Sequence, residues 1–387
     1  MSKNPFLNNP NEYSDVLKDT IDAFGLKNDH YIKKSKFLKE KENLFFNEWS
    51  ALCFSSDLIS VGYVKALKFL GLPLIVVKDK TKKIRVFQNT CRHRGMILFE
   101  KSRKLKSSLI VCPYHSWSYS LDGKLLKTPH VGGANKNHDE GIDCKNLSLY
   151  EIKCHEWLGI VFINVNKNKD RFDKVHFSLI NRWREFNQKL YFSKNESEIT
   201  FNLKCNWKLA VENYCDAYHL PWVHPSLNQY SRLEDHYEIN DNYLFSGQGS
   251  YHYETLSENN LPLFSNFKNL SKKWKLGAEY ISLFPNVLLG VHCDHIFSII
   301  LEPKSLKKTR ERIRIFYSSE KMISKEMHEK RKKNTERWKK VFEEDVFAVE
   351  GMQKGRDGKF FDGGKFSKSM DGPTHTFHKW VSNLMKI

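Results

Sequence analysis

The sequence has no apolar run long enough to cross a membrane as a helix. The longest such run, residues 69–77, is far shorter than the roughly 20 residues that a spanning helix needs. The first ten residues lack the basic stretch and apolar stretch of a signal peptide, and no repeat or low-complexity segment follows. We therefore expect a soluble cytoplasmic protein whose eight cysteines are not paired as disulfides.

Acidic residues are scarce relative to basic ones. The chain has 45 Asp and Glu against 63 Lys and Arg, which gives a formal net charge of +18. The basic residues are spread along the chain without a nucleic-acid-binding motif, so we expect no nucleic-acid partner. We interpret the positive charge first as a solvated lysine-rich surface. A more specific alternative is that it attracts an acidic partner or an anionic substrate.

A dinucleotide-binding motif is also missing, because no G-x-G-x-x-G segment follows a predicted strand.

The length of 387 residues suggests two domains, with three as the upper limit. Residues 1–47 are polar and in part helical. Residues 48–166 are rich in short apolar runs separated by Gly, Asn and Asp, which predicts strands. A charged linker at 166–174 precedes a region of mixed helices and strands, residues 175–387. The predicted strands of the first region lie at 62–64, 74–77, 84–87, 108–112 and 160–165.

In the second region the spacing of apolar residues predicts a helix over 206–219, with Trp207, Ala210, Val211 and Tyr214 buried. Pro221 should stop or kink this helix just after His219. Further strands are expected at 281–289, 296–301 and 312–317. A long helix is expected over 324–351, and its basic first half, residues 325–340, is interpreted as a solvated face rather than as a docking site for an acidic ferredoxin.

Two short segments each combine one cysteine with one histidine. Cys91 and His93 are followed, after 18 intervening residues, by Cys112 and His115. Two thiolates and two imidazoles suit either one tetrahedral zinc ion or a Rieske cluster, in which the thiolates hold one iron and the imidazoles the other. Zinc fingers group Cys with Cys and His with His. The mixed segments found here favour the Rieske cluster.

A second group of metal-binding residues lies downstream. Asp216 and His219 are three residues apart and would share one face of a helix. His224 follows beyond Pro221, where a broken helix can fold it back. Two histidines and one carboxylate form the facial triad of mononuclear iron oxygenases, which leaves positions open for O2 and substrate.

Both groups lie in segments that closely resemble the Rieske non-haem iron oxygenase α subunits. Residues 89–95 and 112–117 resemble the two cluster loops, and residues 121–123 continue the likeness. Ser116 departs from the glycine usual in the family, which removes no ligand. Residues 213–224 resemble the iron motif N-x-x-D-x-x-H-x4-H at every named position.

The resemblance implies specific roles for these residues. Cys91, His93, Cys112 and His115 would hold the [2Fe–2S] cluster, and His219 and His224 the mononuclear iron. Asp216, with Asn213 as a second candidate catalytic residue, would link the iron histidine of one subunit to a cluster histidine of its neighbour. The third iron ligand would come from a carboxyl-terminal helix, where Asp345 is our candidate and Glu344 the main alternative, with Glu343 beside it.

The implied fold is α+β, with an N-terminal Rieske β-domain at 48–166 and a C-terminal helix-grip catalytic domain at 175–387 that contains an antiparallel sheet. Residues 1–47 would pack on the catalytic domain. The implied protein is the oxygenase subunit of a homotrimer. It would take electrons that originate from NAD(P)H through a separate reductase or ferredoxin and would use O2 to hydroxylate a small organic substrate.

The segments around Asp345 and at residues 377–380 resemble the choline, glycine betaine and carnitine oxygenase branch. That branch favours oxidation at an N-methyl group or an adjacent carbon, with an aromatic cage around the cation; the broader family hydroxylates aromatic rings. Two alternatives stay open: a Rieske electron-transfer protein without oxygenase activity, and a zinc-stabilised binding module.

Residues 292–295 (His-Cys-Asp-His) also suggest metal binding. Strand alternation would place His292 and Asp294 on one side and Cys293 and His295 on the other. We therefore expect strand residues near the pocket rather than a metal site.

Overall fold

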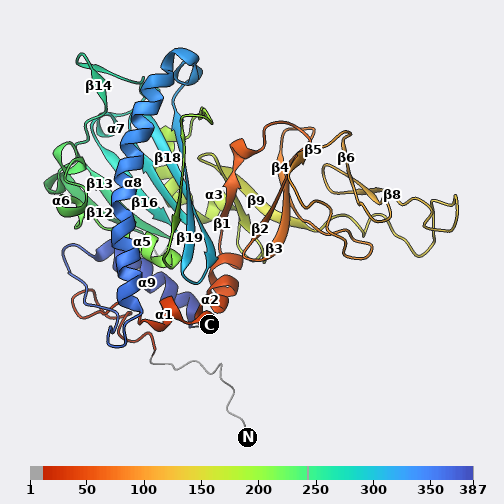
Figure 1. The fold of residues 1–387 in the computed structure, drawn as a ribbon, viewed down its shortest axis with the longest axis horizontal. Coiled ribbons are helices and arrows are strands. Elements are labelled where there is room, and N and C mark those ends of the chain that lie inside the picture. The colour runs from red at the N-terminus through yellow and green to blue at the C-terminus, as the bar shows by residue number, and fades with distance from the viewer. Residues whose placement is uncertain (1–11, 242–243, 387) are drawn as a thin grey trace, which may run out of the picture. The chain divides into compact units, whose positions relative to one another are not determined.

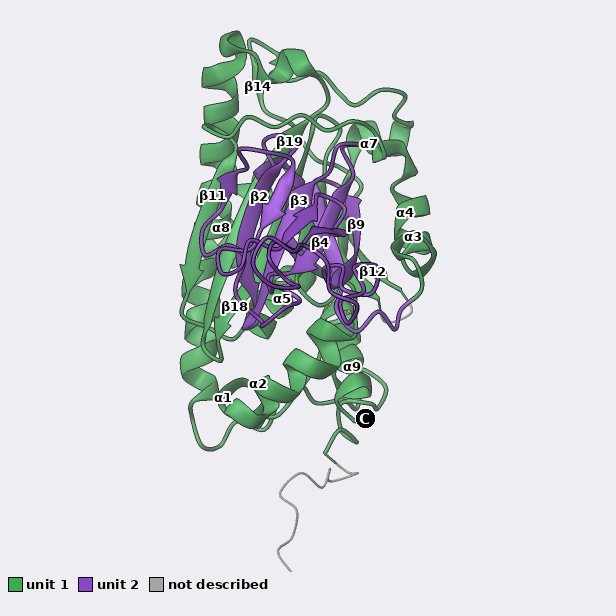
Figure 2. Ribbon diagram, turned by 90° about the vertical axis from the view of Figure 1, so that its right-hand side faces the viewer, with its two compact units in different colours: residues 1–50, 170–387 green, residues 51–169 purple. Residues whose placement is uncertain are grey.

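The computed structural model describes residues 12–241 and 244–386. The chain forms two compact units: Ala51–Lys169, and a unit that combines the residues up to Ser50 with those from Asp170 on (Figure 2). Each unit has its own antiparallel sheet (Figure 1). In the described ranges no helix is both long and apolar enough to cross a membrane.

The smaller unit is built around a sheet with the strand order β1-β10-β9-β4-β3-β2-β5. A second sheet with the order β6-β7-β8 extends it. These strands are β1 (Ser50–Phe54), β2 (Tyr63–Phe69), β3 (Leu72–Lys78), β4 (Ile84–Gln88), β5 (Arg103–Lys104), β6 (Leu109–Val111), β7 (Ser118–Ser120), β8 (Leu125–Lys127), β9 (Glu151–Trp157) and β10 (Ile160–Asn164). The strands β2, β3, β4, β6 and β10 overlap the predicted strands, whereas β1, β5, β7, β8 and β9 were not predicted from the sequence.

One apolar cluster joins the two sheets of this unit. It contains Ile75 and Phe87 from the large sheet and Tyr119 from the small one. Cys91 and Cys112 belong to the same cluster and are almost fully buried. The segment after β4 and the β6–β7 hairpin therefore present the two cysteines from a rigid core.

The larger unit contains a sheet with the order β11-β19-β18-β17-β16-β13-β12, antiparallel throughout. Its strands are β11 (Glu198–Leu203), β12 (His236–Asn240), β13 (Phe245–Ser250), β16 (Ala278–Leu283), β17 (Val287–Val291), β18 (His295–Ser305) and β19 (Lys308–Tyr317), and a separate two-stranded sheet pairs β14 (Ser257–Glu258) with β15 (Leu261–Pro262).

The helices of this unit are α1 (Asp29–Ile32), α2 (Lys34–Glu40), α3 (Phe172–Val175), α4 (Phe177–Arg182), α5 (Trp207–Cys215), α6 (Leu220–Val223), α7 (Lys272–Leu276), α8 (His328–Arg356) and α9 (Gly372–Met385). Helix α5 packs on β13, β16 and β18, and α8 lies along α5 and β11 (Figure 1). Helix α9 packs on α5, β12 and β13. Because helices cover the antiparallel sheet, the prediction of an α+β fold is confirmed.

Glu212 of α5 connects this helix to three distant parts of the unit. Its carboxylate accepts a 2.5 Å hydrogen bond from the hydroxyl of Tyr31 and lies 3.3 Å from Nη2 of Arg356 and from Nε2 of His378. Burial raises the pKa of Glu212, but His378, Arg356 and Tyr31 outweigh burial and hold this pKa at about 2. The buried carboxylate therefore stays charged and joins α1, α8 and α9 to α5.

Several predicted boundaries were wrong. The helix predicted over 206–219 ends at Cys215, and Pro221 lies in the first turn of α6 rather than stopping the helix before it. Proline suits that position because the first N–H groups of a helix have no partner within it. The predicted strand 281–289 is a hairpin of β16 and β17 around the Phe284–Pro285 peptide.

The long C-terminal helix is shifted, and the predicted linker is partly ordered. Helix α8 begins four residues later than expected, at His328, because residues 320–327 form 3₁₀ turns, and it continues past Gly351 to Arg356. The linker predicted at 166–174 includes the start of α3 at Phe172.

The alternation predicted for residues 292–295 was also wrong. Residues 292–294 form the tight turn between β17 and β18, and His295 is the first residue of β18. The His292 N–H donates to the His295 carbonyl over 3.0 Å. The turn stacks the two imidazoles at 4.4 Å instead of placing them on opposite sides. Nε2 of His295 accepts the indole N–H of Trp338 over 2.7 Å, and its Nδ1 donates to Asp294 over 2.6 Å. Both nitrogens of His295 are thereby engaged in hydrogen bonds.

Candidate functional site

The connection between α5 and α6 places the first candidate residues. Asn206 caps α5 by accepting the backbone N–H of Lys208 over 3.1 Å. The helix ends where Asp216 takes an extended backbone conformation. The Asp216 carboxylate then accepts both the backbone N–H (3.1 Å) and Nδ1–H (3.0 Å) of His219. Asp216 and His219 are therefore hydrogen-bonded through a turn, and they do not share one face of a helix as the spacing had predicted.

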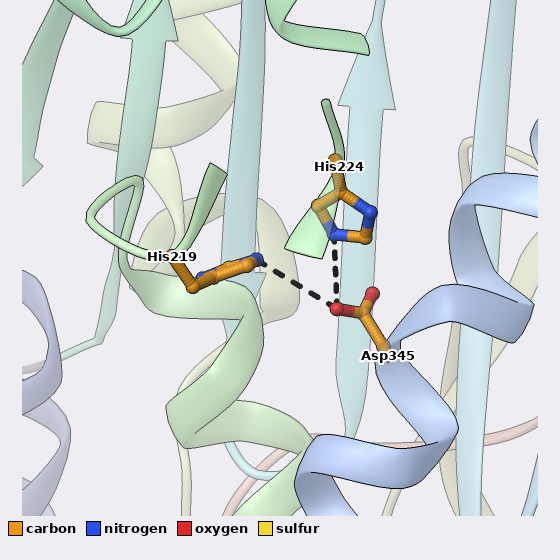
Figure 3. A group of neighbouring side chains, drawn as sticks. All are labelled: His219, His224 and Asp345. Atoms are coloured by element: carbon orange, nitrogen blue, oxygen red, sulfur yellow. Dashed lines mark ion pairs between the residues drawn. The ribbon is translucent and has the colours of Figure 1, made fainter. Parts of the chain in front are cut away.

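His219, His224 and Asp345 converge, and one potential ligand atom of each lies within 4.8 Å of the others (Figure 3). Asp345 comes from the middle of α8, which lies against α5. Its Oδ1 is 3.0 Å from Nε2 of His224 and 3.7 Å from Nε2 of His219. The two histidines thus approach the same carboxylate oxygen from different directions.

The donor set fits a metal ion. Over the described residues, Oδ1 of Asp345 is a buried oxygen that no hydrogen-bond donor reaches with acceptable geometry. Leaving such an atom without a partner is costly, and an ion between the three side chains would satisfy it. Two imidazoles and one carboxylate match the facial triad of non-haem iron sites.

Glu344 occupies a different position from Asp345. Its Oε2 lies 2.9 Å from Nδ1 of His224, on the opposite side of the ring from Asp345. Burial lowers the pKa of His224, but the two carboxylates outweigh burial and raise it. Asp345 itself adds to the effect of burial on Glu311, whose pKa rises to about 8.

A pocket opens beside the three residues. Tyr214, Tyr280, Phe297, Trp338 and Phe342 form an aromatic wall, and Ser231, His236 and Gln248 a polar one; Asn213, Leu220, Leu227 and Val341 complete the lining with His219, His224 and Asp345. Gly290 pairs with both Tyr280 and Phe297, and a Cβ there would overlap the Phe297 ring. The glycine thus lets the Phe297 ring lie across β17 toward the pocket.

The second candidate site lies in the smaller unit, and the same backbone hydrogen-bond pattern occurs in both of its loops. The Cys91 N–H donates to the Met96 carbonyl over 2.8 Å, and the Gly95 N–H returns to the Cys91 carbonyl over 3.1 Å. The Cys112 N–H donates to the Trp117 carbonyl over 2.8 Å, and the Ser116 N–H returns to the Cys112 carbonyl over 3.1 Å. Gly95 and Ser116 both have a positive φ, 72° and 55°. The two segments are therefore equivalent loops.

The imidazoles of these loops lie together. The His93 and His115 rings are 4.8 Å apart, and His93 stacks on Trp117 at 4.6 Å. Nδ1 of His93 is buried without a hydrogen-bond partner among the described atoms. The Tyr119 hydroxyl lies 3.2 Å from Sγ of Cys91. Buried thiols next to half-exposed imidazoles, one with an orphaned nitrogen, fit a metal cluster.

Comparison with protein families identifies both units. The profile described as "Ring hydroxylating alpha subunit (catalytic domain)" matches residues 182–387, and the profile "Rieske [2Fe-2S] domain" matches residues 48–144. The first match covers more than half of the chain.

The chain belongs to the ring-hydroxylating α-subunit family. It is 27% identical over 332 residues to the carnitine monooxygenase oxygenase subunit of Escherichia coli, an alignment that covers 84% of this chain and 82% of the relative. It is 23% identical over 363 residues to the chloroplastic choline monooxygenase of Spinacia oleracea, covering 92% and 77%.

The fold agrees with a solved member of the family. A quaternary ammonium Rieske monooxygenase, described for carnitine oxidation and inter-subunit electron transfer, superimposes with a TM-score of 0.75 at 20% identity. The match covers 100% of this chain and 99% of that one. The predicted arrangement, a Rieske domain followed by a catalytic domain, is thereby confirmed.

Membership of this family settles the choice between the alternatives left open by the sequence. The chain is the catalytic subunit of a Rieske oxygenase, and its two domains imply a [2Fe–2S] cluster and a mononuclear iron. A zinc-stabilised module and a pure electron-transfer protein are excluded, since the catalytic domain accompanies the Rieske domain. The assignment of individual ligands stays a prediction, supported by the orphaned atoms of His93 and Asp345.

Sequence reasoning missed the residues that surround these sites. Tyr119 beside Cys91 and Gln248 in the pocket wall carried no local signal, because each acts on a residue at least 28 positions away. Glu344 was visible only as an alternative to Asp345. The structure instead places it as the hydrogen-bond partner of His224.

Proposed function

We propose that this oxygenase acts on a quaternary ammonium compound and hydroxylates an N-methyl group or an adjacent carbon. The observation that carries the proposal is the composition of the pocket. Five aromatic side chains line it, and its described lining includes no Lys or Arg, although the chain carries a net charge of +18. The carnitine and choline oxygenases similar to this chain support the same substrate class.

Four of the aromatic side chains, Phe297, Trp338, Phe342 and Tyr280, form one continuous wall. Ring centroids are 4.6 Å apart for Phe297 and Trp338, 5.2 Å for Phe297 and Phe342, and 6.2 Å for Phe297 and Tyr280. Aromatic faces attract a quaternary ammonium group through their quadrupoles, an interaction worth about 2 kcal/mol when desolvated. A lysine or arginine in the same wall would repel the cation.

The geometry of the metal-site residues supports the following proposed roles. His219, His224 and Asp345 would hold the iron, and Cys91, Cys112, His93 and His115 the cluster. When bound, the cluster supplies single electrons and the iron activates O2. The overall reaction is R–H + O2 + 2 e⁻ + 2 H⁺ → R–OH + H2O. Glu344 would orient the His224 ring, and the aromatic wall would hold the substrate carbon near the triad.

We further propose that the enzyme works as a homotrimer in which Asp216 connects two subunits. Its carboxylate already accepts two hydrogen bonds from His219 and keeps 20% of its surface accessible. Two exposed aromatic residues, Tyr218 (48%) and Trp222 (70%), lie in the same segment. An exposed apolar patch next to a functional carboxylate suits an interface between copies of this chain.

The proposal also includes the external partners and the domain limits. Electrons from NAD(P)H would reach the cluster through a separate reductase or ferredoxin in the cytoplasm. Residues 48–166 would form the Rieske domain and 175–387 the catalytic domain, with Asn213 of α5 as a residue of the catalytic pocket.

Oxygen uptake by the reconstituted enzyme tests the substrate class. Choline, glycine betaine and L-carnitine would be compared with 3,3-dimethylbutan-1-ol, a neutral isostere of choline, and with naphthalene. We expect O2 consumption and a product heavier by one oxygen atom, or its demethylated derivative, with at least one of the three quaternary ammonium compounds. Turnover of naphthalene with none of these three compounds would contradict the proposal.

Variants test the residue assignments. His219→Ala should keep the visible absorbance of the cluster and lose the mononuclear iron, whereas His93→Ala should lose that absorbance. Asp216→Asn should retain both metals and slow turnover severely. Unchanged turnover in Asp216→Asn would show that Asp216 does not relay electrons.

A further inference from the structure

A chain of hydrogen bonds runs from the pocket wall to Asp216. The Ser231 hydroxyl lies 3.0 Å from Nε2 of His236, and Nδ1 of His236 lies 2.6 Å from Oε1 of Gln248. Nε2 of Gln248 donates to the backbone carbonyl of Asp216 over 2.9 Å. Asp216 in turn accepts the two hydrogen bonds from His219. Five residues are thus linked in sequence, from pocket wall to metal site.

The direction of each hydrogen bond follows from the chemistry of the groups. The Asp216 carbonyl can only accept, so the amide nitrogen of Gln248 must face it. The amide oxygen of Gln248 must then accept from Nδ1–H of His236. Burial lowers the pKa of His236, and Nε2 of its ring lies 3.0 Å from the Ser231 hydroxyl.

The position of Gln248 in the sheet fixes this arrangement. Gln248 is on β13, directly opposite Tyr280 of β16, and His236 is on the adjacent strand β12. Ser231 is fully buried, and Ser231, His236 and Gln248 all line the same pocket as His219. A substrate that contacts this polar wall would touch groups connected to Asp216.

We propose that Gln248 is a positioning residue that links the substrate pocket to the Asp216–His219 pair, so that a bound substrate sets the orientation of the Asp216 carboxylate. The proposal rests on the proposed role of Asp216. The amide of Gln248 holds the peptide plane of Asp216 just after the end of α5, and a displaced chain would let Asp216 rotate away from His219.

Hydrogen exchange in the iron-loaded enzyme gives the first test. The His219 backbone N–H donates to the Asp216 carboxylate, so its exchange rate reports the orientation of that carboxylate. Gln248→Met, which has nearly the same volume but neither amide group, should speed exchange in residues 216–224 about fivefold, the effect of losing one neutral hydrogen bond. Gln188→Met is the matched control, because Nε2 of Gln188 donates to the Lys268 carbonyl over 2.8 Å, outside the pocket lining.

Electron transfer gives the second test. The cluster is reduced chemically and mixed with O2, with and without choline, glycine betaine or L-carnitine. In the wild type, substrate should accelerate reoxidation of the cluster, and Gln248→Met should reduce this acceleration about tenfold at unchanged iron and sulfide content. If none of the three compounds accelerates reoxidation of the wild-type cluster, the proposed substrate class is wrong. In that case Gln248→Met should still slow reoxidation of the cluster in the absence of substrate.

Gln248→Glu provides a second variant in case Gln248→Met binds no iron. It keeps an oxygen for His236 and places a second oxygen against the Asp216 carbonyl, which breaks that bond alone. It should show the same faster exchange and the same loss of acceleration. Wild-type exchange and wild-type acceleration in either iron-loaded variant would overturn the proposal, as would loss of iron from both variants, which would indicate a purely structural role.

Discussion

Glu344 and His224 form a pair on the side of the imidazole that faces away from Asp345. Oε2 of Glu344 lies 2.9 Å from Nδ1 of His224, while Nε2 of the same ring lies 3.0 Å from Asp345. Because Glu344 accepts the Nδ1 hydrogen, it fixes the tautomer that leaves Nε2 free to bind a metal. The adjacent carboxylates Glu344 and Asp345 of α8 thus contact opposite nitrogens of the same imidazole.

Glu344→Ala should therefore weaken iron binding without abolishing it. Loss of an outer partner of a metal-binding histidine costs about 10- to 100-fold in affinity, whereas Asp345→Ala should remove the iron completely. Iron content after dialysis against a graded series of chelator concentrations measures the difference. Glu343→Ala is the control, since Glu343 is exposed on the same helix turn. Complete loss of iron in Glu344→Ala with retention in Asp345→Ala would reverse the two roles.

The Tyr119 hydroxyl is expected to tune the cluster. It accepts the Arg92 backbone N–H over 3.1 Å, so its own hydrogen is available to Sγ of Cys91 at 3.2 Å. A hydrogen bond to a ligating sulfur stabilises the reduced, more negative cluster and raises its potential. Tyr119→Phe should lower the midpoint potential, as measured by redox titration of the visible absorbance. Tyr114→Phe, an exposed tyrosine in the neighbouring loop, should leave the potential unchanged; an equal shift in both would contradict the assignment.

Local patterns in the sequence located only some of the strands, and they singled out His219 and His224 as candidate metal ligands. Short β-branched runs predicted β2, β3, β4 and β10 to within a few residues. His219 and His224 could be found because their spacing is local. The end of α5 could not be predicted in this way, because it depends on the hydrogen bond from the His219 N–H to the Asp216 carboxylate. The spacing of apolar residues carries no information about such a bond.

Long-range pairs were beyond sequence reasoning altogether. Gln248 reaches Asp216 across 32 positions, and Glu212 meets Arg356 across 144. The stacking of His292 on His295 could not be predicted, because it depends on the tight turn that separates His292 from the first residue of β18. Asp345 was assigned through the resemblance to a known family, since a single carboxylate on a charged helix carries no signal of its own.

Ser116 and Gly95 occupy equivalent positions in the two cluster loops, which permits a reciprocal test. A non-glycine residue in the left-handed region lowers the stability of the folded state by about 1–2 kcal/mol. Glycine lowers it by about 0.5–1 kcal/mol, because glycine makes the unfolded chain more flexible. Ser116→Gly should therefore stabilise the domain by about 0.5–1 kcal/mol, and Gly95→Ser should destabilise it by a similar amount. A Cβ at Gly95 has room, with its nearest contact at 3.9 Å. Loss of cluster absorbance on heating measures both, and a destabilised Ser116→Gly would contradict the argument.

The depressed pKa of Glu212 makes a prediction about acid stability. This pKa is 4.5 for the free side chain and about 2 in the folded protein, so the charged form favours folding at every pH above about 4.5. The contribution, roughly 3 kcal/mol at about 1.4 kcal/mol per pH unit, is lost as the pH falls from 4.5 to 2. Glu212→Gln should lower the unfolding temperature at pH 6 and approach the wild type as the pH falls to 2. Glu329→Gln, at an exposed residue of α8, should match the wild type throughout. A difference between wild type and Glu212→Gln that does not change with pH would show that the carboxylate acts through packing and not through its charge.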